Sequence, residues 1–226
     1  MSAAGVFSSL ARIGEVQAHL PGPSAVLLAL VAGAAASFLW PVTQHFATMA
    51  HEGAHATVGL VTGQKLAHIT FERNGNGATL LTGGGAVAGF VTGLAGYLGP
   101  SAAGIGAAAL IRVGHMVAVL WVGALALLVI MLSLRKRSFG FLSVPVAFVL
   151  LVGVTCVASA AVQVATAYVV AWFLLVSGLK VARIHGKNAA DAKALQSKTK
   201  VPAAFWSFVW QTGAVAALVL GAILLV

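Results

Sequence analysis

Two histidines and a glutamate fall within the five residues HEGAH, at positions 51–55, inside an otherwise apolar stretch. On an α-helix, His51 and His55 are four positions apart, so both imidazoles project from one face about a turn apart. This spacing lets both bind one tetrahedral zinc ion. Glu52 lies on the neighbouring flank, where its carboxylate can take a proton from water attacking a carbonyl and return it to a leaving amine. The pattern predicts metal-assisted hydrolysis.

A different interpretation is that these polar groups satisfy one another or line a polar cavity. Ionisable groups within membrane-spanning segments are costly and usually functional. A chance H-E-x-x-H is also improbable in a chain with seven histidines and four carboxylates. Both arguments favour the metal site.

A catalytic zinc commonly has a third protein ligand, either a carboxylate or an imidazole. Asp191 is the acidic candidate, although composition alone favours a solvated charge in its lysine-rich surroundings; His115 and His185 are weaker ligand candidates. His45, seven residues before Glu52, lies near the same helix face and is a candidate for a supporting hydrogen bond, as is His115. The residues alone leave the third ligand open.

The composition indicates a membrane protein, because 60% of the 226 residues are hydrophobic and only 8% are charged. Soluble domains carry about 25% charged residues. Apolar runs long enough to cross a bilayer number six or seven, since the third and fourth could form one broken unit. They cover residues 24–40, 41–62, 83–111, 113–134, 139–158, 161–179 and 203–226. We therefore expect an all-α polytopic membrane protein in a single domain, residues 1–226.

The net charge of +9 is concentrated in short segments beside these runs, at residues 135–137 and 180–200. This is the positive-inside pattern, so it argues for a bilayer and against a nucleic-acid partner. Counting seven spans back from the basic segments places the N-terminus in the cytoplasm and the C-terminus outside. The N-terminal sequence lacks the features of a cleaved signal peptide. The expected location is the cell membrane of a bacterium.

Two polar interruptions separate the spans. Residues 63–85 contain two strand-like runs, AHITFE and ATLLT, around RNGNG, which favours a small β-hairpin directly after the H-E-x-x-H helix. Residues 180–202 are basic and helix-forming after Asn188, and Pro202 is suited to begin the last span. The single cysteine, Cys156, excludes an intramolecular disulfide and a cysteine-based zinc site.

Several segments resemble the site-2-protease-like intramembrane zinc metallopeptidases of bacteria, specifically their short actinobacterial-type branch. They are HEGAH, GLVTGQKLAHITF, GNGATLLTGG, AGYLGPSAAG and ADAKALQSKTKVPAAFW, within residues 44–206. The resemblance implies one zinc ion per chain, with His51 and His55 as ligands and Glu52 as the base. It also implies that Asp191 is the third ligand. Here Asp191 lies in a lysine-rich segment rather than on a membrane helix, so residues 188–195 must fold back toward the membrane.

The resemblance also implies a role for the hairpin turn. Site-2 proteases are thought to hold their substrate as an extended strand, so the candidate substrate-binding residues are Asn74, Gly75, Asn76 and Gly77. The implied substrate is a membrane-spanning protein, for example an anti-sigma factor.

Two other functions remain open on the residues alone. One is a non-proteolytic membrane protein that uses the site to bind or sense a metal. The other is a metal or proton transporter, although a relay does not require histidines at i and i+4.

Overall fold

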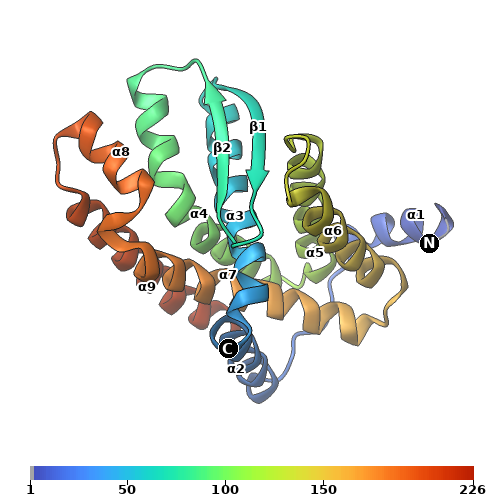
Figure 1. The fold of residues 1–226 in the computed structure, drawn as a ribbon. Helices are drawn as coiled ribbons and strands as arrows, with labels where there is room; N and C mark the ends of the chain where they lie inside the picture. Colours follow the sequence, from blue (N-terminus) through green and yellow to red (C-terminus); the bar gives the residue numbers. More distant parts are fainter. Residues whose placement is uncertain (1–2) are drawn as a thin grey trace.

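The computed structural model describes residues 3–226, which form a helical bundle with one small sheet (Figure 1). In chain order the elements are α1 Ala3–Ala11, η1 Arg12–Gly14, α2 Gly22–Phe38, α3 Trp40–Val61, β1 Lys65–Phe71, β2 Gly77–Thr82, α4 Ala86–Arg112, α5 Met116–Leu132, α6 Gly140–Val157, α7 Ala160–His185, η2 Gly186–Asn188, α8 Ala190–Thr199 and α9 Ala203–Leu225. The H-E-x-x-H motif lies on α3, and Asp191 lies in the first turn of α8.

The predicted hairpin is confirmed. β1 and β2 pair antiparallel, and the sheet lies against α3 (Figure 1). Asn74 Oδ1 accepts a hydrogen bond from the Asn76 amide at 2.9 Å, and Gly75 takes a positive φ of 89°. An Asx turn with a glycine of positive φ at its centre is the conformation that this turn sequence favours.

The outer edge of β1 is also paired. The amide of Ile69 donates to the Ser133 carbonyl at 2.7 Å, and the amide of Arg135 donates to the Ile69 carbonyl at 2.8 Å. At Phe71, two residues after Ile69 on β1, the carbonyl accepts a hydrogen bond from the Phe139 amide at 3.0 Å. The basic linker between α5 and α6 is therefore held against the hairpin.

The expected first two spans form one bent unit. α2 and α3 meet at Leu39 at an angle of 104°. The Lys180 ammonium group, on α7, donates to the Ala36 carbonyl at 2.6 Å and lies 4.4 Å from the centre of the Trp40 ring. A lysine that caps the carboxyl end of a helix in this way satisfies carbonyls with no helical partner. α7 thereby holds the bend that directs α3.

The predicted count of six or seven spans is not confirmed. Within residues 3–226, four helices are long and apolar enough to cross a membrane: α4, α6, α7 (extended to Asn188) and α9. The bent α2–α3 pair would be a fifth, and α5 is apolar but has 17 residues. Apolar length alone did not reveal the bend, so α2 and α3 were counted as separate spans.

The bend also changes the expected placement of the N-terminal segment. Ser9 Oγ donates to the Thr155 carbonyl at 2.9 Å, and Gln17 Oε1 accepts from the Met116 amide at 2.9 Å. We call the end of the bundle that holds the basic segments, residues 133–139 and 186–202, the basic end. There Lys198 reaches the Gly89 carbonyl at the start of α4. The contacts of Ser9 and Gln17 lie at the end of α6 and the start of α5, which we call the opposite end. We had expected the N-terminal segment on the side of the basic segments.

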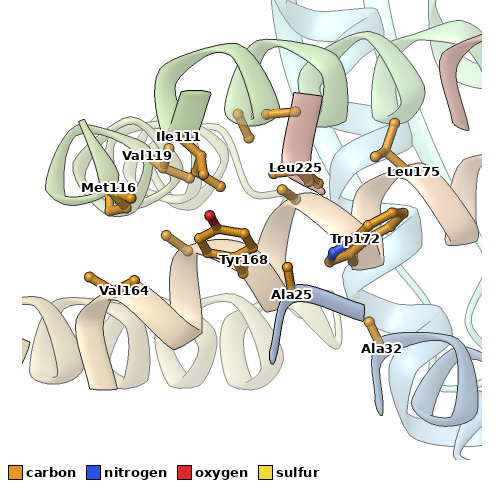
Figure 2. Packing of buried hydrophobic residues seen from close by; sticks show 14 of the residues in the cluster. Ala25, Ala32, Ile111, Met116, Val119, Val164, Tyr168, Trp172, Leu175 and Leu225 are labelled. Carbon is orange, nitrogen blue, oxygen red and sulfur yellow. The ribbon is translucent and has the colours of Figure 1, made fainter. Parts of the chain in front are cut away.

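The main apolar core lies between α2, α4, α5, α7 and α9. Figure 2 shows Tyr168 and Trp172 of α7 at its centre, with Ala25 and Ala32 of α2 on one side. A second buried cluster holds α8 against its neighbours, because Ala192 and Leu195 of α8 pack with Tyr97, Trp206 and Trp210. Burial of this apolar face fixes a short polar helix beside the membrane helices.

Candidate metal centre

Three possible ligand atoms converge at the contact of α3 with α8. His51 Nε2 and His55 Nε2 are 3.1 Å apart, and Asp191 Oδ2 lies 3.3 Å from each of them. The histidines come from one helical face, as their spacing predicts. The aspartate comes from 136 residues further along the chain, brought there by the packing of α8.

The distances fit a tetrahedral zinc ion. Ligand atoms at ~2.0–2.1 Å from zinc stand about 3.3–3.4 Å from one another in a tetrahedron. The three observed separations, 3.1, 3.3 and 3.3 Å, are close to that edge length. The residues present therefore fit a zinc ion with three protein ligands and one open position.

A hydrogen bond on the far side of His55 supports the same conclusion. His55 Nδ1 lies 2.8 Å from the Thr92 carbonyl oxygen, which can only accept, so Nδ1 carries the proton. In a neutral imidazole, Nε2 then presents its lone pair toward His51 and Asp191. Lone pairs and a carboxylate this close repel one another unless a cation or a proton lies between them. Such a carbonyl partner is typical of a metal-binding histidine.

Gly96 leaves room for the ion. A Cβ atom at this position of α4 would lie 2.5 Å from His51 Nε2 and closer still to His55 Nε2. Those separations are only slightly longer than a zinc–nitrogen bond of ~2.0–2.1 Å. The missing side chain of Gly96 thus coincides with the space that the two imidazoles share.

The charge state of Asp191 suits a ligand. Burial alone would raise the pKa of this carboxyl, but the imidazoles of His51 and His55 beside it hold the pKa below its ordinary value. The carboxylate is therefore ionised at neutral pH and can bind a cation.

Glu52 is on α3, and its side chain, on the side of the hairpin, is buried, with the residue only 4% exposed. Thr79 Oγ1, on β2, donates to Glu52 Oε2 at 2.7 Å. A Cβ on Gly77 would come within 2.9 Å of the other carboxylate oxygen, Oε1. A buried carboxylate next to a candidate metal site and oriented by one hydroxyl is suited to proton transfer.

The turn residues lie beside α3, one helical turn before Glu52. Thr48 Oγ1 donates to the Gly75 carbonyl at 2.6 Å, and Asn74 Nδ2 donates to the side chain of Glu72 at 2.9 Å. Both asparagines are exposed, and the side chain of Asn74 is used within the turn. Any contact of these residues with a substrate would involve the hairpin backbone more than the Asn74 side chain.

The remaining predicted histidines do not join the three ligands. The ring of His45 lies tilted against that of Phe139, with 5.1 Å between the ring centroids. His115 Nδ1 lies 3.4 Å from the Glu15 carbonyl, and His185 Nδ1 lies 3.2 Å from the Val181 carbonyl. His115 is at the opposite end of the bundle, since Gly96 and Arg112 are separated by about 24 Å of helix. Among residues 3–226, the group of side chains that could hold a metal ion consists of His51, His55 and Asp191.

Sequence reasoning missed Thr79, Thr92 and Gly96. Thr79 occupies an inward position of β2, and Thr92 and Gly96 are four residues apart on one face of α4. Their spacing is visible in the sequence, but the partner that each faces is set by tertiary packing.

A bundle of apolar helices that gathers two histidines, an aspartate and a buried glutamate has the features of a membrane metallopeptidase. The family described as Peptidase M50B-like matches residues 24–221, which is most of the chain, and the protein belongs to this family. The match confirms the resemblance to site-2-protease-like peptidases. No curated protein and no solved structure gave a significant match.

Proposed function

We propose that the protein is an intramembrane zinc metalloendopeptidase that hydrolyses peptide bonds of membrane-spanning proteins. The observation that carries the proposal is the triangle of His51, His55 and Asp191, with Glu52 buried beside it. Membership of the M50B-like family supports the metallopeptidase class. The apolar helices and this class also support our proposal of a multi-pass location in the bacterial cell membrane.

His51, His55 and Asp191 would hold the ion. When bound, zinc would polarise the scissile carbonyl and lower the pKa of a water molecule to ≈ 7. Glu52 would take the proton of the attacking water and pass it to the leaving amine. The hydroxyl of Thr79 holds one oxygen of that carboxylate, which fixes its orientation and leaves the other oxygen, Oε1, for the proton.

The hairpin supports the proposal that a substrate is held by main-chain hydrogen bonds. Ile69 and Phe71 direct their backbone groups outward to the α5–α6 linker, and their partners in the register are Thr79 and Gly77. In an antiparallel pair, the backbone N–H and C=O groups of two directly opposed residues either both face the partner strand or both face away from it. Gly77 and Thr79 therefore direct their amide and carbonyl groups to the outer edge of β2, next to Glu52.

An extended substrate segment would pair with this outer edge of β2. In Figure 1, β2 lies between β1 and the first half of α4. A peptide bond in a helix is hydrogen-bonded and shielded, so main-chain pairing with β2 would stabilise the unwound form that hydrolysis requires. The substrate class that fits is a single-span regulator, with an anti-sigma factor as one example.

Glu52→Gln tests the catalytic role. We expect zinc content to stay at the wild-type level while cleavage falls by about 10²–10⁴-fold, because the amide cannot accept the proton. Cells that produce wild type or variant are compared by quantitative proteomics for fragments that end within membrane spans. Glu15→Gln, an exposed glutamate at the opposite end, is the matched control and should leave cleavage unchanged.

The same comparison separates the other functions. Fragments that persist at the wild-type level in Glu52→Gln cells would rule out this mechanism. If no fragments form in either strain but Glu52→Gln blocks metal uptake, the transporter is correct. Bound zinc with neither activity would indicate a binding or sensing protein.

Metal content tests the ligands. We expect about one zinc per chain in detergent-purified protein, and loss of that zinc in both His51→Ala and Asp191→Ala, since each removes one of three ligands. Inductively coupled plasma mass spectrometry on protein purified without added metal gives the measurement. Lys193→Ala, an exposed residue two positions after Asp191, should retain the metal. Unchanged zinc in Asp191→Ala would remove Asp191 from the ligand set.

A further inference from the structure

A surface groove between α7 and α9 lies apart from the metal site. It has a volume of 380 Å³ and is lined by Arg183 of α7 and by Phe208, Gln211, Thr212, Val215 and Ala216 of α9. The α9 residues are spaced at i, i+3, i+4, i+7 and i+8, so they form one face of that helix. The volume is within the range of about 300–1,000 Å³ typical of ligand sites.

The part of the groove nearest the basic end of the bundle is charged. Arg183 is exposed and has no hydrogen-bond or ion-pair partner among residues 3–226. It lies three residues before Gly186, where α7 ends at the basic end of the bundle. Gln211 uses one amide hydrogen to donate to Ser207 Oγ at 2.9 Å, and the second hydrogen of that NH2 group is available. These donors suit an anion, and a guanidinium group binds phosphate with particular strength.

Apart from Thr212, the rest of the groove is apolar, and it runs toward the middle of α9. Phe208 is 63% exposed and Val215 is 42% exposed, and Val219, one turn further, is 56% exposed. An inorganic anion would make no use of this surface. A ligand with a negatively charged head and a hydrocarbon chain matches both parts.

We propose that this groove is a specific binding site for an anionic phospholipid. The phosphate would accept hydrogen bonds from Arg183 and Gln211, and an acyl chain would lie along Phe208, Val215 and Ala216. The charge of the occupant follows from the unpaired guanidinium group, and its chain follows from the apolar face of α9.

Native mass spectrometry of the detergent-purified protein tests the site, with phosphatidylglycerol and phosphatidylcholine of identical acyl chains as probes. We expect one phosphatidylglycerol molecule to be retained at least about tenfold more strongly than phosphatidylcholine. This preference should be lost in Arg183→Gln. It should persist in Arg135→Gln, which removes the same charge from the exposed α5–α6 linker.

A second variant tests the apolar part. Ala216→Trp should fill the lower groove and reduce phosphatidylglycerol retention while Arg183 is intact, and millimolar inorganic phosphate should not compete. Equal losses in Arg183→Gln and Arg135→Gln would show general attraction to surface charge and overturn the site. Competition by phosphate, or full retention in Ala216→Trp, would show a simple anion contact and would also overturn it.

Discussion

Position 96 controls the space that the three ligand atoms surround. In Gly96→Ala the new methyl group would lie where the two imidazoles meet, so we expect zinc affinity to fall by more than about 100-fold, the upper range for changes around the ligands. Competition with a fluorescent zinc chelator measures the affinity.

Gly106→Ala is the matched control for this prediction. It makes the same change on the same helix at a position where a Cβ meets nothing within 4 Å. Zinc affinity should be unchanged. If Gly96→Ala binds zinc as tightly as Gly106→Ala does, the ion does not occupy the space beside Gly96.

The candidate site was predictable to the extent that it is local. His51, Glu52 and His55 follow from the spacing of one helical turn. Asp191 needed the family resemblance, because nothing in its lysine-rich segment indicates that α8 packs against α4 and α9 and so brings Asp191 to the histidines of α3. Thr79 and Thr92 contact Glu52 and His55 from other elements, and neighbouring residues in the sequence do not indicate such pairings.

The bend between α2 and α3 depends on a residue of a third helix. Lys180→Met keeps most of the apolar stem but leaves the carbonyls of Ala36 and Ser37 without their donor and removes the charge from the Trp40 ring. We expect the free energy of unfolding to fall by about 1–3 kcal/mol, the cost of an unsatisfied buried group. Unfolding by SDS titration gives the measurement, and Lys180→Arg should restore part of the loss.

Lys136→Met provides the comparison, since Lys136 is exposed in the α5–α6 linker. Surface changes of this kind alter stability by less than about 0.5 kcal/mol. Equal stability of Lys180→Met and Lys136→Met would mean that Lys180 does not hold the bend.

Sequence patterns predicted those elements whose determining residues are adjacent in the chain. The hairpin was predictable because its turn residues and alternating strands are contiguous, and α9 begins directly after Pro202 as expected. The bend was not predictable, because α2 and α3 are both apolar and helical and Lys180 lies 144 residues from Ala36. Long-range capping determined where one apolar run ends and the next begins.

The arrangement of the whole bundle leads to a proposal about orientation. If the basic end faces the cytoplasm, as the positive-inside rule implies, the N-terminal segment lies on the outer side. This follows when the bent α2–α3 pair is taken as one span rather than two. A Cβ on Gly22 would lie 4.0 Å from the Val226 carbonyl oxygen, so α2 begins at the end of the bundle where α9 finishes.

Cysteine labelling tests the orientation. In a Cys156→Ser background, we expect Ser8→Cys to react with a membrane-impermeant maleimide in intact cells and Lys136→Cys to react only after lysis. Both positions are exposed. Protection of Ser8→Cys in intact cells, together with reaction after lysis, would return the N-terminal segment to the cytoplasm.

The pairing of the α5–α6 linker with β1 has a consequence for self-association. A two-stranded sheet normally has two open edges, and each can recruit a strand from another chain. Here the edge at Ile69 and Phe71 is occupied by a segment that carries Arg135, Lys136 and Arg137. Strands can therefore be added on one side only, so two copies cannot continue the sheet in both directions, and growth of a fibril from this hairpin is blocked.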